Sequence, residues 1–371
     1  MVSGSIGGSI WRSTPMDFWQ PGQPLAKGRY TIASAPRVSG DRTTVTYMAT
    51  DNQTRERVAI ETPNPDIHDA PKLAKIQSRF VQEAQKLTKC SGHSHIIGVR
   101  GFLFDEGGLY CLPLEYLAGV TLADLESVCL EESKALEYVR QIGEALTVVH
   151  QNNLVHGDVR PENLHLRIGS NEAVLTEFSL TREVGSGWTT EYSHSARSKT
   201  DWKDFAAPEA IKDEEKPTPR SDLYMLGGTL YYLLTGRAPV GAIERLNGNA
   251  LEFTRVTDGG RLSGNVRDAI ASAMELKEEK RPESVRAWLV SLGFEVSEAT
   301  GAVQKLSQED LNYQEAQLKI RAQELEIKSK QWALAVTVIT GMVGVIGWGV
   351  SKLQPTQPTN EPASQTQQEA K

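Results

Sequence analysis

The stretch HGDVRPENL, residues 156–164, decides the fold of this 371-residue chain. Apolar residues recur at helical spacing over residues 132–151, and the short link NNLV at 152–155 separates them from this stretch. Three polar residues of different chemistry, Asp158, Arg160 and Asn163, are concentrated in this one loop. The segments before and after the loop indicate the fold to which the loop belongs.

The segments before the loop favour strands and those after it favour helices. β-Branched and aromatic runs separated by turn-like SGD and DNQTRE predict strands, and apolar residues at helical spacing predict one long helix among them. The predicted strands are residues 30–34, 44–50, 57–61, 95–105 and 108–117, and the predicted helices are residues 69–89, 132–151 and 221–236. A strand-rich part followed by a helix-rich part indicates an α+β protein with two lobes.

HGDVRPENL resembles the catalytic loop H-R-D-L-K-P-E-N-L of the eukaryotic-like Ser/Thr protein kinases. Three further motifs follow in the family's order. FAAPEAI at 205–211 resembles the A-P-E segment, residues 220–240 resemble the long central helix of the large lobe, and EEKRPES at 278–284 resembles the segment that supplies its arginine. The resemblance extends from Lys27 to Phe294 and implies a bilobal protein-kinase-like fold.

The resemblance also implies a structural role for three residues, since Glu209 and Arg281 form an ion pair in that family and Asp222 belongs to its scaffold. The opening PGQPLAKGRYTI is similar to the bacterial, particularly the cyanobacterial, branch. One rival family, the aminoglycoside-type phosphotransferases, shares HGD and a downstream asparagine. It is not expected to carry the three other motifs together.

By the same resemblance, Asp158 is the catalytic aspartate, which orients and deprotonates the substrate hydroxyl group. Asn163 is a magnesium ligand, and Arg160 replaces the usual lysine with the same charge and a different geometry. An alternative stays open, in which these residues are retained only because the hydrogen bonds of the loop hold the large lobe together.

The nucleotide-binding motifs are altered. Glu177 is expected to be a metal ligand at the position of the D-F-G aspartate, where its longer side chain displaces the carboxylate by about 1 Å, enough to cost about a hundredfold in rate. Ser39, Asp41 and Thr44 occupy glycine positions of the phosphate-covering loop, where side chains obstruct close approach to phosphate. Glu115 completes this degenerate nucleotide site.

Glu61 stands at the position of the V-A-I-K lysine, the family's phosphate-neutralising cation, and Glu83 is its helix-borne partner. Two such like charges about 4 Å apart repel by about 4 kcal/mol at an effective dielectric constant near 20. We identify Arg42, Arg55 and Arg57 as the only bases in these strands and interpret them as solvated turn residues.

These changes favour a pseudokinase that binds a protein partner, such as another kinase or a substrate protein, and uses no cofactor. The alternative is a weak or atypical Ser/Thr kinase that uses ATP with Mg²⁺. A third hypothesis is an acidic pocket formed by Glu61, Glu83 and Glu177, which would hold Mg²⁺ or Ca²⁺ without nucleotide.

Composition restricts the function further. The net charge of -7 is spread along the chain and gives no indication of a nucleic-acid partner. Cys90, Cys111 and Cys129 lie far apart, which favours reduced thiols over a disulfide framework. The start of the chain lacks a basic segment followed by an apolar core, so no secretory signal is expected.

Residues 332–350 carry no charge and are long enough to cross a bilayer as a helix, with a buried globular helix as the alternative. More basic residues precede this segment than follow it, which predicts a single-pass protein with a cytoplasmic N-terminal part. Gly341, Gly344 and Gly347 favour close helix packing and hence a homodimer. The predicted domains are a flexible leader (1–26), the kinase-like domain (27–294), a helical juxtamembrane linker (295–331), the membrane helix (332–350) and a disordered polar tail (351–371).

Overall fold

The computed structural model describes residues 18–39, 42–125, 129–178, 201–211, 217–255 and 260–295. All of these belong to one of the two units into which the chain divides, Met1–Lys305. The other unit, Leu306–Lys371, lies outside the described residues, and with it most of the predicted juxtamembrane linker, the membrane helix and the tail. Within the described ranges, no helix is both long and apolar enough to cross a bilayer.

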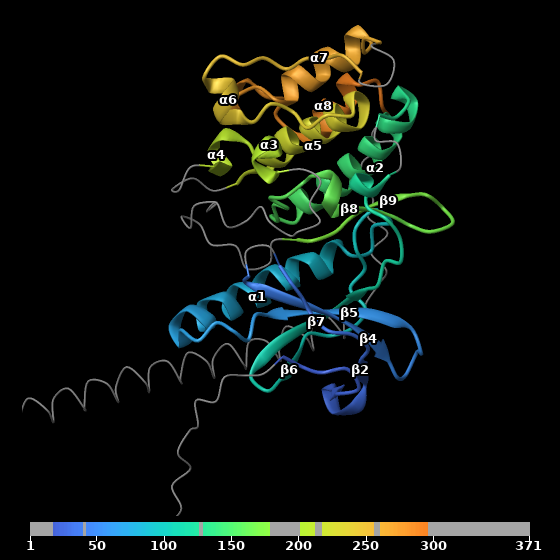
Figure 1. Ribbon diagram of the computed structural model, residues 1–371, viewed down its shortest axis with the longest axis vertical. Coiled ribbons are helices and arrows are strands. Elements are labelled where there is room, and N and C mark those ends of the chain that lie inside the picture. Colours follow the sequence, from blue (N-terminus) through green and yellow to red (C-terminus); the bar gives the residue numbers. More distant parts are fainter. Residues whose placement is uncertain are drawn as a thin grey trace, which may run out of the picture. The chain divides into compact units, whose positions relative to one another are not determined.

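The first lobe contains a seven-stranded sheet in the order β1-β2-β4-β5-β7-β6, with β3 paired to β4. Burial alternates along β4, as expected for a strand with two different faces. One long helix, α1, packs against β5 and β7 (Figure 1). The elements of this lobe are β1 Pro24–Leu25, β2 Tyr30–Ile32, β3 Arg37–Val38, β4 Thr44–Asp51, β5 Arg57–Pro63, α1 Ala70–Cys90, β6 Phe104–Glu106 and β7 Leu109–Glu115.

The N-terminal residues of the described chain correct the prediction of a flexible leader through residue 26. Phe18 and Trp19 pack on the sheet, where the Trp19 ring lies 4.9 Å from the ring of Tyr47. β1 pairs with β2, and the Ala26 backbone N–H donates to the Glu106 carboxylate at 2.7 Å. The kinase-like domain therefore begins before Lys27, because this segment covers apolar side chains that the sheet would otherwise expose.

The predicted strand at residues 95–105 is shorter in the structure, where only β6 remains of it. Ile96 instead forms an isolated bridge with Leu175, and Val99 forms one with Leu114. The apolar run is thus divided between two partners that are distant in sequence, which a local pattern does not reveal.

The second lobe is helical and is built around α5, whose residues from Ser221 to Thr235 are all buried. Its ends follow from the sequence: Thr218 caps the N-terminus, Pro219 begins the helix, and Gly236 ends it in a left-handed conformation with φ 76°. α5 packs against α2, α7 and α8 (Figure 1). The elements are α2 Glu132–Gln151, β8 Leu164–Leu166, β9 Ala173–Leu175, α3 Trp202–Phe205, α4 Pro208–Ile211, α5 Pro219–Thr235, α6 Ala242–Leu246, α7 Gly264–Ala273 and α8 Val285–Ser291.

Glu209 and Arg281 form a buried ion pair in this lobe, at 2.6 Å and 2.8 Å between guanidinium nitrogens and carboxylate oxygens. Ser221 adds a hydrogen bond to the same carboxylate at 2.7 Å. Burial acts to raise the pKa of Glu209, but the Arg281 hydrogen bonds and charge outweigh it and lower that pKa. The pair joins the segment before α5 to the segment before α8.

We expect Arg281→Met to lower the free energy of unfolding by about 3–5 kcal/mol, because it leaves the Glu209 carboxylate buried without its partner. Urea denaturation of the full chain, followed by tryptophan fluorescence, measures this loss. The double variant Glu209→Leu/Arg281→Met removes both charges and should recover most of the stability. A single variant as stable as the parent would contradict a structural role for the pair.

Candidate functional site

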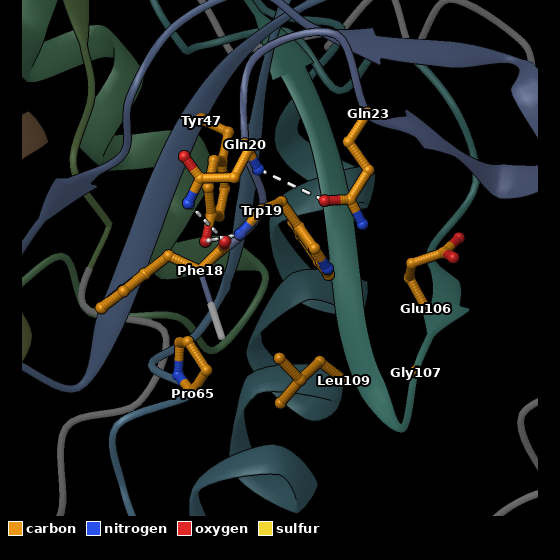
Figure 2. Close-up of a pocket in the computed structure, with 9 residues that line it drawn as sticks. All are labelled: Phe18, Trp19, Gln20, Gln23, Tyr47, Pro65, Glu106, Gly107 and Leu109. Carbon is orange, nitrogen blue, oxygen red and sulfur yellow. Dashed lines mark hydrogen bonds between the residues drawn. The ribbon is translucent and has the colours of Figure 1, made fainter. Parts of the chain in front are cut away.

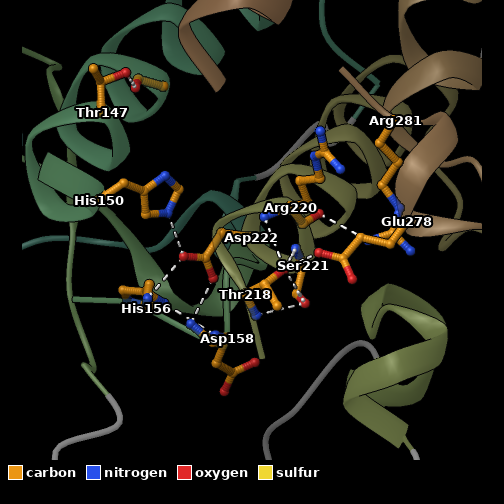
Figure 3. A network of polar contacts seen from close by, with 12 residues as sticks. Thr147, His150, His156, Asp158, Thr218, Arg220, Ser221, Asp222, Glu278 and Arg281 are labelled. Atoms are coloured by element: carbon orange, nitrogen blue, oxygen red, sulfur yellow. Dashed lines mark hydrogen bonds and ion pairs between the residues drawn. The ribbon is translucent and has the colours of Figure 1, made fainter. Parts of the chain in front are cut away.

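The loop at residues 156–164 is held in place by the buried carboxylate of Asp222 in α5. Its two oxygens accept the backbone N–H groups of His156 at 2.9 Å and Gly157 at 2.7 Å. His150 Nε2 lies 2.8 Å from the same carboxylate (Figure 3). One acid therefore satisfies two buried backbone donors and fixes the start of the loop against α5.

His156 connects this loop to the segment that carries Glu177. Its Nε2 atom is 2.7 Å from the carbonyl oxygen of Thr176, and its ring contacts the Phe178 ring edge-on at 4.7 Å between centroids. Glu177, between these two contacts, has φ 58°, a conformation that costs energy for a residue with a side chain. The fold therefore brings Glu177 to the loop at the expense of local backbone strain.

The three loop residues singled out by sequence lie together. The Asp158 carboxylate accepts a hydrogen bond from Arg160 Nε at 3.0 Å, and the Asn163 side-chain amide donates to the Asp158 carbonyl oxygen at 2.8 Å. Burial acts to lower the pKa of Arg160, but the charges of Asp158 and Glu162 raise it overall. Arg160 thus neutralises Asp158 in this structure, and the two hydrogen bonds hold the loop in a defined conformation.

A cation that the sequence analysis missed lies above this loop. Arg37 in β3 is opposite Thr46 of β4, and Thr46 is opposite Glu61 of β5. Residues opposite each other in a sheet share a face, so Arg37 and Glu61 are on the same side of the sheet. The Arg37 guanidinium forms an ion pair with the Glu177 carboxylate. That charge is the main cause that raises the pKa of Arg37, and Glu61 adds to it.

Arg37 therefore corrects the prediction that Arg42, Arg55 and Arg57 are the only bases of these strands. Arg42 and Arg55 do occupy turn-like backbone with φ 57° and 65°. Arg57, however, is the first residue of β5, and its guanidinium lies 5.8 Å from the Tyr116 ring centre. A hairpin assignment between residues 37–38 and 44–50 would have found Arg37, since the register then places it beside Glu61.

The two acids predicted to repel each other both interact with a cation. Glu83 pairs with Lys86 at 3.1 Å, one turn further along α1, and Glu61 interacts electrostatically with Arg37. The hypothesis of an acidic metal pocket finds no support, because no group of three or more His, Cys, Asp and Glu side chains in the described ranges could hold a metal ion. At Glu177, the ion pair with Arg37 engages the carboxylate that would have to bind a metal ion.

Hydrogen bonds join Ser39 and Thr44, which flank the segment expected to cover phosphate. The Ser39 N–H donates to the Thr44 carbonyl oxygen, and the Thr44 N–H donates to the Ser39 hydroxyl oxygen, both at 3.0 Å. These backbone donors are consequently used within the hairpin, whereas a phosphate cradle needs them free. Asp41 lies outside the described residues.

Glu115 holds the end of β7 through its side chain. Its carboxylate binds the Arg167 guanidinium, with one contact at 3.0 Å, lies 3.5 Å from Arg100, and accepts the Gly98 N–H at 3.2 Å. Burial acts to raise the pKa of Glu115, but Arg167 lowers it overall. This carboxylate thus connects β7 with the segment after β8, and its assignment to a nucleotide site stays a prediction.

The magnesium–nucleotide group that the motifs imply does not fit the residues present. Asn163 offers one amide oxygen, but Glu177 is engaged by Arg37, and Glu61 replaces the cation that phosphates need.

Comparison with known proteins shows the family. The Protein kinase domain family model matches residues 39–288. The serine/threonine-protein kinase PknK of Mycobacterium bovis is 31% identical over 226 residues, which make up 59% of this chain and 19% of PknK. The serine/threonine-protein kinase PrkC of Bacillus subtilis is 30% identical over 214 residues, which make up 57% of this chain and 31% of PrkC. The chain therefore spans only a minor part of either relative.

A solved structure, the apo form of PpkA-294, shares the fold with a TM-score of 0.52 at 18% sequence identity. The likeness covers 74% of this chain and 99% of PpkA-294. It supports the predicted bilobal protein-kinase-like fold. The family match favours the protein kinases over the aminoglycoside-type phosphotransferases.

We expect a double-mutant cycle on Arg37→Gln and Glu177→Gln to give a coupling energy of about 0.2–1 kcal/mol, because both side chains are partly exposed to water. Glutamine keeps the side-chain length at the strained position 177. Urea denaturation at low salt and at about 1 M NaCl measures the coupling, which should decrease at the higher salt concentration. A coupling unchanged by salt would mean that the pair is not held by exposed charges.

Proposed function

Because the chain belongs to the protein kinase domain family, we propose that it is a membrane-anchored signalling protein of this fold that works as a pseudokinase. It regulates or scaffolds a protein partner, such as another kinase or a substrate protein. The observation that supports this proposal most is the arrangement of charges in the cleft. Glu61 stands where the family has its phosphate-binding cation, and Arg37 forms an ion pair with Glu177.

Electrostatics explains why this arrangement opposes nucleotide binding. Phosphoryl transfer depends on cations that neutralise the phosphates, and a triphosphate without them is repelled by nearby carboxylates. Here Glu61 adds a negative charge where the family has a positive one. The one cation identified on this face of the sheet, Arg37, already interacts with two acids. Ser39 and Thr44 also use the backbone donors that would cradle the phosphates.

The large lobe keeps the interactions that a binding scaffold needs. Asp222 anchors the loop at 156–164, and the Glu209–Arg281 pair fixes the segments around α5. Such a lobe presents a rigid surface to a partner at little cost in conformational entropy. Residues 332–350 would hold the protein at the membrane and, through Gly344 and its neighbours, support a homodimer.

A weak or atypical ATP-dependent Ser/Thr kinase is the second candidate. The contacts among Asp158, Arg160 and Asn163 favour it, because they keep a potential catalytic carboxylate in a defined position. Arg37 supplies the cation that this candidate needs, provided that it leaves Glu177.

Thermal unfolding of the full chain in detergent, with and without Mg–ATP, separates the two candidates. A ligand at 100 times its Kd stabilises by about 2.7 kcal/mol, a shift of several degrees. We expect the melting temperature of the parent to change by less than about 1 °C at about 1 mM Mg–ATP, with no phosphate transferred to a generic protein substrate.

Restoring the residues that the kinase family has at positions 61 and 177 tests whether the altered charges prevent Mg–ATP binding. Glu61→Lys combined with Glu177→Asp should produce a shift of a few degrees with Mg–ATP, because it returns a cation and a shorter carboxylate to the cleft. Glu56→Lys, with Glu177→Asp, is the matched control, since it makes the same charge change in an exposed turn. A parent protein that is stabilised by nucleotide, with turnover lost in Asp158→Ala, would establish the kinase instead.

A further inference from the structure

A cavity of about 630 Å³ lies on the sheet, within the size range of ligand-binding pockets. β4 separates it from the kinase cleft, since Tyr47 lines the cavity while its neighbour Thr46 shares the opposite face with Glu61. The residues that line it are Phe18, Trp19, Gln20, Gln23, Tyr47, Pro65, Glu106, Gly107 and Leu109.

Aromatic and apolar side chains line part of the cavity, together with the polar side chains of Gln20, Gln23 and Glu106. The Trp19 ring lies beside the Tyr47 ring, and the Trp19 backbone N–H donates to the Tyr47 hydroxyl group at 3.3 Å. Pro65 and Leu109 also line the cavity and are drawn below Trp19 in Figure 2. Phe18 and Trp19, which pack against the core of the sheet, are partly exposed.

The charge in and around the cavity is negative. Among the lining residues that the structure describes, Glu106 is the one that carries a charge. One Glu106 oxygen, Oε2, accepts the Ala26 N–H at 2.7 Å, and its other oxygen has no partner among the described residues. Asp66 follows the lining residue Pro65 in the sequence, whereas Asp105 alternates with Glu106 along β6 and is on the opposite face of the strand.

We propose that this cavity binds the side chain of an arginine presented by a partner protein. A guanidinium group is planar and weakly hydrated, so it can stack on Trp19 while its N–H groups donate to the unoccupied oxygen of Glu106. A neutral apolar side chain would leave the Glu106 charge desolvated without compensation, and an acidic one would be repelled. None of the residues that line the cavity belongs to the kinase cleft. Arginine binding in the cavity is therefore independent of nucleotide binding in the cleft.

The probe is N-acetylarginine amide, with N-acetylcitrulline amide as the neutral analogue of nearly the same shape. Binding to the full chain in detergent is measured by saturation-transfer NMR and by titration calorimetry. We expect the arginine probe to bind with a Kd in the millimolar range, about tenfold more tightly than the citrulline probe. Equal affinities for the two probes would overturn the proposal.

Glu106→Gln tests the role of the charge while keeping an oxygen for the Ala26 N–H. It should weaken arginine binding about tenfold, to the level of citrulline, without changing citrulline binding. Trp19→Leu should weaken arginine binding by about threefold or more, with its melting temperature recorded to exclude unfolding. Glu56→Gln is the matched control, because it removes one exposed acid from the turn before β5 and should leave the affinity unchanged.

Arg12 is close in sequence to the lining residue Phe18 and lies outside the described residues. The same titration on the Arg12→Gln variant shows whether the Arg12 side chain competes with the arginine probe for the cavity. An unchanged affinity supports a partner's arginine as the occupant. A rise of about tenfold would identify Arg12 as the occupant and overturn the proposal, as would an affinity of Glu106→Gln equal to that of the parent.

Discussion

The hydrogen bonds that Asp222 accepts are the constraint on which the rest of the site depends. Its buried carboxylate is the acceptor for the backbone of His156 and Gly157, and neither N–H is reached by water. Removal of this carboxylate would leave two buried donors unsatisfied, each at a cost of about 1–3 kcal/mol. The positions of Asp158 and Asn163, and through His156 that of Glu177, all follow from this anchor.

The two halves of the cleft are under different physical constraints. On the side of the helical lobe, buried groups such as Asp222 and Arg281 hold the backbone, and a change in any of them destabilises the fold. On the side of the sheet, Glu61 and Arg37 are partly or largely exposed, so their charges can change at little cost in stability. This difference means that charges on the sheet side can vary more readily than the buried groups of the helical lobe.

The altered charges compensate one another. Glu61 brings an acid where a base is expected, and Arg37 brings a base to the same face of the sheet. The Arg37–Glu177 pair is exposed and contributes little to stability, so it does little to hold the two lobes together. Its effect is electrostatic, because the Arg37 charge neutralises the Glu177 carboxylate.

The sequence by itself determined the two-lobed fold, the long helices and the Glu209–Arg281 pair. Helical spacing, Thr218 and Gly236 define α5 locally, and the order of the motifs along the chain identifies the partners of the pair. Only the tertiary structure revealed Arg37 beside Glu61 and the packing of Trp19 on the sheet. Cross-strand register and long-range packing bring together residues that are distant in sequence, and no local periodicity carries that information.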